Sequence, residues 1–106
     1  MQRESVIRIL REHEQELKRA GVVRLSLFGS VARGESGRDV DLLAEFDPTK
    51  SLTLLDMAGI EYRLSELLGT PVDLAPAKML KKPVALRAAD EAVLVFPPGT
   101  SNDPTG

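Results

Sequence analysis

The stretch that decides the fold is residues 22–46, VVRLSLFGSVARGESGRDVDLLAEF. Residues 22–28 are mostly apolar or β-branched, which predicts a strand with Val23, Leu25 and Leu27 on one face. That strand ends directly in Gly29 and Ser30, and residues 30–34 suit a short helix capped by Ser30. After a turn-rich segment, residues 39–46 predict a second strand. Its inner face is formed by Val40, Leu42, Ala44 and Phe46.

The segments on either side predict further helices and strands. Residues 3–20 have apolar spacing typical of one amphipathic helix that ends at Gly21. Its stripe consists of Val6, Leu10, His13 and Leu17. Residues 52–68 predict a second long helix that stops at Gly69, with a stripe of Leu54, Met57, Ile60, Leu64 and Leu67. Short strands are expected at 71–75 and 93–96, and a helix at 84–92. This alternation of strands and helices predicts a small α/β fold.

Length and composition restrict the class of protein. The 106 residues are enough for one domain, which we expect over residues 1–96. Residues 97–106 have little to bury and are expected to form a disordered tail. The net charge of −2 argues against a chain that mainly coats nucleic acid. With no apolar run long enough to span a membrane and no signal-peptide core, we expect a cytoplasmic protein.

The absence of cysteine and the single His13 restrict the chemistry. Disulfides, thiolate zinc sites and cysteine nucleophiles are excluded, and so is a His-rich metal site. His13 lies on the predicted helix stripe, where a packed or boundary residue is the simpler interpretation. Tyr62 is likewise explained by helix spacing as a core or interface residue.

Three acidic residues lie on segments that are otherwise apolar. Asp39 and Asp41 are two residues apart on a predicted strand, so both carboxylates leave the same face. Asp73 lies between Val72 and Leu74 on another short strand, and it adds a third carboxylate if the two strands pair. Carboxylates beside an apolar sheet are unfavourable unless a positive group meets them. We therefore predict a divalent cation, and a ligand set without His or Cys suits Mg²⁺ or Mn²⁺.

The turn at Gly29 and Ser30 is the second candidate feature. Glycine allows close approach to the backbone, and free amides at a helix start with the Ser30 hydroxyl can hold phosphate. No P-loop string occurs in the chain. Taken alone, each feature is more typical of a solvated strand end or an ordinary helix start. Their combination within one short stretch, with Asp73 added, favours a metal-dependent phosphate site.

In motif order, Leu27 to Glu35, Asp39 to Phe46 and Gly69 to Leu74 resemble the minimal nucleotidyltransferases (MNT) of the polymerase-β superfamily, which accompany HEPN partners. The resemblance covers residues 1–96 and implies a small polymerase-β palm-like fold with a mixed β-sheet packed against helices. It implies that Asp39, Asp41 and Asp73 are the catalytic carboxylates and the ligands of two Mg²⁺ ions. It also implies that Gly29 and Ser30 hold the triphosphate of ATP, and that Arg33 neutralises it.

The function implied by this resemblance is transfer of AMP from ATP to a hydroxyl, expected to be a tyrosine, of a partner HEPN toxin. The chain would then be an antitoxin. Two alternatives stay open: a non-catalytic nucleotide-binding antitoxin that neutralises its partner by complex formation, and a transferase that acts on a small molecule. We expect no acceptor-binding domain beside the one predicted over residues 1–96, and this expectation counts against the small-molecule transferase.

The chain departs from the family pattern between the turn and the acidic pair. Eight residues separate Ser30 from Asp39, a shorter spacing than is usual, and Arg38 replaces the usual serine. Arg38 is interpreted as a loop residue in preference to a phosphate contact. The basic residues Lys78, Lys81 and Lys82 are interpreted as solvated, although phosphate or an acidic partner are alternatives.

Overall fold

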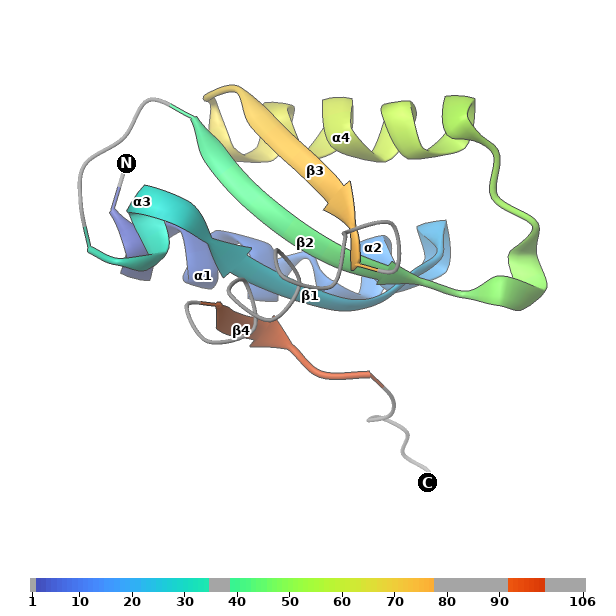
Figure 1. Cartoon of the computed structure of the whole chain (residues 1–106), viewed down its shortest axis with the longest axis horizontal. Helices are drawn as coiled ribbons and strands as arrows, with labels where there is room; N and C mark the ends of the chain where they lie inside the picture. Colours follow the sequence, from blue (N-terminus) through green and yellow to red (C-terminus); the bar gives the residue numbers. More distant parts are fainter. Residues whose placement is uncertain (1, 35–38, 78–91, 99–106) are drawn as a thin grey trace.

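The computed structural model describes residues 2–34, 39–77 and 92–98. Their strands form one sheet in the order β3-β2-β1-β4 (Figure 1). The strands are β1 (Val22–Phe28), β2 (Val40–Phe46), β3 (Val72–Pro76) and β4 (Val93–Phe96). β1 runs antiparallel to both β2 and β4, whereas β2 and β3 are parallel. The expected mixed sheet and all four strands are therefore confirmed.

Helices cover one side of this sheet. They are α1 (Arg3–Glu12), α2 (Glu14–Ala20) and α4 (Leu54–Leu68), and they lie on the same side of the strands (Figure 1). The four-residue α3 (Gly29–Ala32) follows β1 at one end of the sheet, and a short 3₁₀ helix η1 (Pro48–Lys50) follows β2. Within the described residues, no helix is long and apolar enough to cross a membrane.

The core lies between the sheet and these helices. Strand alternation sends Val40, Leu42 and Ala44 of β2 into it, and all three are almost completely buried. Asp41 therefore points to the opposite face. On β1 the register shifts between Val22 and Arg24, so Val22 is buried, and the expectation that Val23 shares the buried face of Leu25 and Leu27 is wrong.

The prediction of one helix over residues 3–20 is also wrong, because the helix breaks at His13. The His13 ring Nδ1 lies 2.9 Å from the Ile9 carbonyl oxygen, the atom that would accept the His13 backbone N–H in a continuous helix. That N–H donates instead to the Leu10 oxygen at 3.1 Å. A local bond between side chain and backbone thus replaces one helical bond. The half-buried His13 is a boundary residue, as expected.

α4 begins at Leu54, two residues later than predicted, because Thr53 caps it. The Thr53 hydroxyl accepts the Asp56 N–H at 3.2 Å, and the Asp56 carboxylate accepts the Thr53 N–H at 2.9 Å. The helix ends at Gly69, as predicted, where φ is +70°.

The buried face of α4 consists of Ile60, Leu64 and Leu68. The expectation that Leu54 belongs to this stripe is wrong, since this first-turn residue is 77% exposed. Tyr62, expected in the core or an interface, is exposed in the chain by itself. Several predictions fall on residues that the structure does not describe: positions 84–91 of the helix predicted over 84–92, Arg38, Lys78, Lys81, Lys82 and the tail beyond residue 98.

Candidate active site

The three candidate aspartates lie at one end of the sheet. Because β2 and β3 are parallel, their first residues meet at the edge where the antiparallel β1 ends (Figure 1). Asp41 is directly paired with Phe28 on one side and with Asp73 on the other. Asp39 immediately precedes β2. The fold therefore brings Asp73 next to the acidic pair, as the sequence predicted if the strands paired.

The environment of Asp41 disfavours its charged form. Desolvation is the main reason that the pKa of Asp41 is raised, and the negative charges of Asp73 and Asp39 raise it further. The positive charge of Arg33 acts in the opposite direction. Asp39 and Asp73 are exposed, whereas Asp41 is half-buried. The negative charge of the three carboxylates at this end of the sheet therefore exceeds the positive charge of Arg33.

Gly29 brings the turn after β1 against this carboxylate. Its φ is +79°, and a Cβ at this position would overlap the Asp41 Oδ2 atom and lie 3.2 Å from Cγ. A residue with a side chain would be strained there and would also displace Asp41. Gly29 is thus required both by the turn and by the space that Asp41 occupies.

The expected cap at Ser30 is wrong. α3 starts at Gly29, with Phe28 at the N-cap position and no side-chain cap bond. The helical bonding begins one residue early because the Arg33 N–H donates to the Gly29 carbonyl at 3.2 Å. Ser30 therefore lies inside the first turn of α3, directly after the glycine.

Arg33 follows α3 and is exposed at the acidic end of the sheet. A hydrogen bond from α1 holds α3 in place, because Arg3 Nη1 donates to the Ala32 carbonyl at 3.0 Å. Arg33 is close enough to influence the pKa of Asp41, which is consistent with a cation that faces the same site.

The donor set fits a hard divalent cation in chemistry and in backbone placement. Carboxylate oxygens are the ligands that Mg²⁺ prefers, and a cation would relieve the repulsion that Asp73 and Asp39 exert on Asp41. In the side-chain positions of the described residues, no group of three or more His, Asp or Glu is already gathered as a metal cluster. A cation shared by the three carboxylates would have to draw the exposed Asp39 and Asp73 side chains toward Asp41.

Two residues that sequence analysis did not single out hold the strand of Asp73. Ser65 Oγ accepts the Val72 N–H at 3.1 Å, and Glu61 Oε2 accepts the Leu74 N–H at 2.8 Å. Both acceptors belong to α4, one turn apart. Their spacing was visible in the sequence, but their contact with the backbone of β3 depends on how α4 packs.

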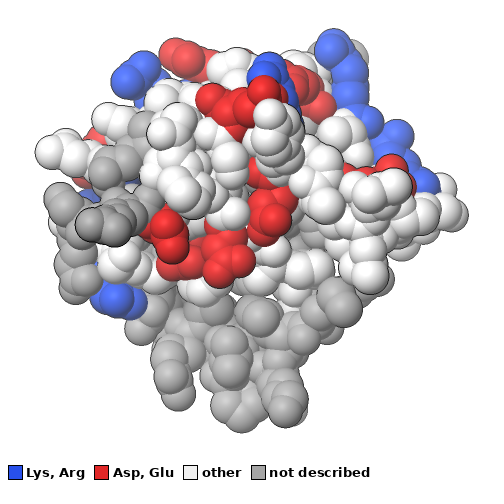
Figure 2. All heavy atoms as spheres, turned by 90° about the horizontal axis from the view of Figure 1, so that it is seen from above, with Lys and Arg blue, Asp and Glu red and all other residues white. Residues whose placement is uncertain are grey.

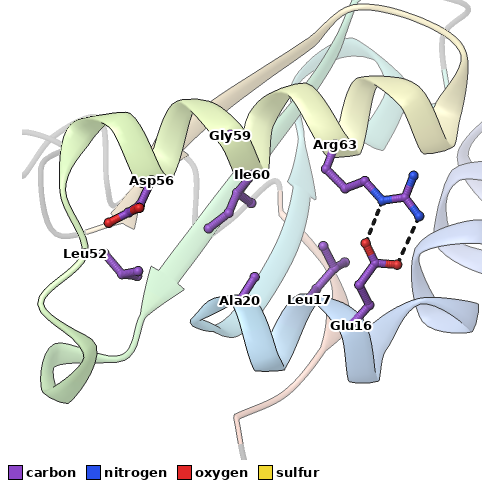
Figure 3. Close-up of a pocket in the computed structure, with 8 residues that line it drawn as sticks. All are labelled: Glu16, Leu17, Ala20, Leu52, Asp56, Gly59, Ile60 and Arg63. Carbon is purple, nitrogen blue, oxygen red and sulfur yellow. Dashed lines mark hydrogen bonds and ion pairs between the residues drawn. The ribbon is translucent and has the colours of Figure 1, made fainter.

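A cavity of about 280 Å³ lies between α2 and α4, and its lining includes none of the three candidate aspartates (Figure 3). It is lined mainly by apolar groups, including Leu17, Leu52 and Ile60. At one side the Arg63 guanidinium binds the Glu16 carboxylate twice, at 2.6 and 3.2 Å. This arrangement joins two helices and offers few polar groups to a substrate.

Comparisons with known proteins agree with the geometry. Residues 8–95 match the family model for the nucleotidyltransferase domain. The protein adenylyltransferase MntA of Thermococcus cleftensis is 39% identical over 95 residues, which cover 87% of this chain and 94% of that protein. A Methanocaldococcus jannaschii protein, MJ0435, assigned as a protein adenylyltransferase, is 40% identical over 82 residues, 76% of this chain and 86% of its own length.

Solved structures share the same fold. One assigned as a minimal nucleotidyltransferase has a TM-score of 0.74 and 38% identity, and the match covers 88% of this chain and 95% of that chain. More distant is the MNT antitoxin complex with a tri-AMPylated HEPN toxin of Shewanella oneidensis, with a TM-score of 0.58, 14% identity and coverage of 80% and 70%. A toxin–antitoxin structure with AMP-PNP has a TM-score of 0.66, 19% identity and coverage of 88% and 76%. On the family match and these identities, the chain is a member of the nucleotidyltransferase family.

Proposed function

We propose that this chain is a protein adenylyltransferase that transfers AMP from ATP to a tyrosine hydroxyl of a HEPN toxin and thereby acts as its antitoxin. The observation that supports this most is the pairing of Asp41 with Asp73 on parallel strands, with the Gly29 turn against the Asp41 carboxylate. The names of the relatives and the complexes formed by structural neighbours support the same reaction and partner. A supply of ATP and an intracellular toxin make the cytoplasm the expected location.

Asp39, Asp41 and Asp73 are proposed to hold two Mg²⁺ ions. When bound, the ions neutralise phosphate charge and lower the pKa of the attacking hydroxyl. Asp41 is central to this set because it lies between the other two and beside the turn. Gly29 and Ser30 are proposed to hold the triphosphate through backbone amides and the hydroxyl, and Arg33 adds a positive charge.

The transfer forms one P–O bond and breaks another. The acceptor oxygen attacks the α-phosphorus of ATP, the bond between the α-phosphorus and the bridging oxygen breaks, and pyrophosphate leaves. Asp73 is proposed to accept the hydroxyl proton, since it is exposed at the end of the sheet where an acceptor can approach. Positioning and charge neutralisation provide most of the rate in phosphoryl transfer, and this chain offers groups for both.

The test is intact-mass spectrometry of a purified HEPN protein encoded beside this chain, incubated with the chain, ATP and Mg²⁺. We expect the HEPN protein to gain AMP, and Asp41→Asn to abolish the gain. A HEPN protein that stays unmodified and is neutralised equally by the wild type and Asp41→Asn would favour the second candidate, a non-catalytic antitoxin.

A further inference from the structure

Among the described residues β3 is one of the two edge strands of the sheet, and side chains of α4 bind its outward N–H groups at Val72 and Leu74. In a strand that pairs on one side only, alternate N–H groups point away from the neighbouring strand. Here the Val72 N–H donates to Ser65 Oγ and the Leu74 N–H donates to Glu61 Oε2. The next outward position is Pro76, which has no N–H. Asp73 thus lies between Val72 and Leu74, whose N–H groups both donate to side chains of α4.

From this arrangement we propose that Glu61, assisted by Ser65, is a positioning residue for Asp73; the inference depends on the proposed role of Asp73. The Ser65 hydroxyl also donates to the Glu61 carbonyl at 3.1 Å, so the two acceptors are fixed relative to α4. α4 is anchored in the core by Ile60 and Leu64. Both the hydrogen bonds from β3 to α4 and the pairing of β3 with β2 therefore determine the distance between Asp73 and Asp41.

Glu61 acts here as a hydrogen-bond acceptor, and its charge is not needed for that role. Glu61→Gln retains a side-chain carbonyl that can accept the Leu74 N–H, whereas Glu61→Ala leaves that N–H without its partner. A role as an additional metal ligand would require the carboxylate and would make both substitutions harmful. The pair of variants separates the two roles.

The experiment measures Mn²⁺ binding by paramagnetic broadening of the Asp73 amide signal, together with AMP transfer. Replacing a group that orients a metal ligand costs about 10- to 100-fold in affinity or activity. We expect Glu61→Ala to weaken Mn²⁺ binding and to lower kcat by at least about 10-fold with an unchanged KM for ATP. Glu61→Gln should resemble the wild type in both measurements, and Leu74 amide exchange should accelerate only in Glu61→Ala.

Equal losses in Glu61→Gln and Glu61→Ala, or wild-type Mn²⁺ binding in Glu61→Ala, would overturn the proposal. If Glu61→Ala does not fold, Ser65→Ala and the hydroxyl-retaining Ser65→Thr give the same comparison at Val72. The Mn²⁺ measurement needs no acceptor protein. A failure of the proposed AMP transfer in the wild type is therefore distinguishable from a failure of this inference.

A second feature, independent of the first, is the outward face of α4. Leu55 is 82% exposed and Tyr62, two turns later, is 68% exposed. Ala58 and Gly59 lie between them and are also exposed. A helix on the surface of a domain normally has charged residues opposite its core face. The face formed by Leu55, Ala58, Gly59 and Tyr62, called here the outer face of α4, is uncharged at these four positions, and the exposed Glu66 continues it one turn after Tyr62.

Gly59 in the middle of this face is not required by the fold of the chain. A glycine inside a helix costs about 1 kcal/mol relative to alanine. Gly59 also lines the cavity between α2 and α4, where a Cβ would meet no heavy atom within 4 Å, and its φ is not positive. Small residues between two large apolar ones allow another helix to approach closely.

Charge decides between a second copy and another protein as the occupant. Two carboxylates of α4, Asp56 and Glu66, lie beside or on the outer face, whereas Glu61 faces β3 and binds the Leu74 N–H. Arg63 already binds Glu16 and Glu66. Acidic side chains gather toward the middle of the surface in Figure 2, and most basic ones lie near its margin. Two copies joined through this surface would bring like charges together.

We infer that the outer face of α4 binds an apolar helix flanked by basic residues on another protein, and the probe is the HEPN protein of the proposed function. The test compares its binding to wild type, Gly59→Ala and Gly59→Arg by titration calorimetry. Both substitutions should raise the melting temperature, because both remove a helical glycine. Gly59→Ala should bind within about twofold of the wild type, whereas the bulk and positive charge of Gly59→Arg should weaken binding by at least about 10-fold.

Equal binding by Gly59→Arg and the wild type would refute the surface. Self-association of the wild type that disappears in Gly59→Arg would identify a second copy as occupant and contradict the charge argument. AMP transfer to the HEPN protein, measured on the same samples, separates the two proposals: a wild type that transfers AMP and binds no better than Gly59→Arg refutes this surface alone.

Discussion

Substitution of Gly29 by alanine tests whether the turn after β1 and Asp41 form one site. Gly29 and Gly34 both have a positive φ, +79° and +86°. A Cβ at Gly29 would overlap Asp41 Oδ2, whereas at Gly34 it would meet nothing within 4 Å. Gly34→Ala is therefore a matched control, because it introduces the same backbone strain without disturbing the carboxylate.

The two substitutions should cost similar stability. Alanine in the left-handed region is less stable by about 1–2 kcal/mol. In a domain of this size, each kcal/mol lowers Tm by about 4–8 °C. Urea titration and thermal melting of both variants measure this loss directly.

Their activities should differ much more than their stabilities. In Gly29→Ala the Asp41 carboxylate must move, and a displacement of about 1 Å near reacting atoms costs about 100-fold in rate. We expect that loss in AMP transfer for Gly29→Ala and near wild-type transfer for Gly34→Ala, both assayed below their melting temperatures. Equal activity in the two variants would refute the assignment of Gly29 to the site.

Three further outcomes are expected. Since burial and neighbouring carboxylates raise the pKa of Asp41, its ionisation destabilises the fold, and Asp41→Asn should melt higher than the wild type at neutral pH. The gap should close as the pH falls from the raised pKa of Asp41 to the usual aspartate pKa. Thr53→Ala removes the cap that Asp56 reciprocates and should lower the free energy of unfolding by about 1 kcal/mol in urea titration. Arg63 lowers the pKa of Glu16, so the stability that this pair adds should be present at neutral pH and be lost in acid, and a double-mutant cycle with Glu16→Gln and Arg63→Gln across pH checks this.

The strands of this chain could be predicted because each is apolar on at least one face and bounded by turn residues. The sequence placed Asp73 beside Asp41 only on the condition that their two strands are neighbours, since strand order depends on how the helices cover the sheet. The cap at Thr53 was available in the sequence as Thr followed three residues later by Asp56, a known helix-start pattern.

Other features depended on contacts that no local pattern contains. The break at His13 arises because its ring competes for the Ile9 carbonyl, although the apolar spacing continues through it. The roles of Glu61 and Ser65 depend on the packing of α4 beside β3.

The most direct test of the metal site is to count, by electron paramagnetic resonance, the Mn²⁺ ions that the chain binds in the presence of a non-hydrolysable ATP analogue. We predict two ions for the wild type and a loss of binding in Asp41→Asn. Wild-type protein that binds no Mn²⁺ with the nucleotide, or Asp41→Asn that binds as many ions as the wild type, would contradict the claim that these carboxylates form the metal site.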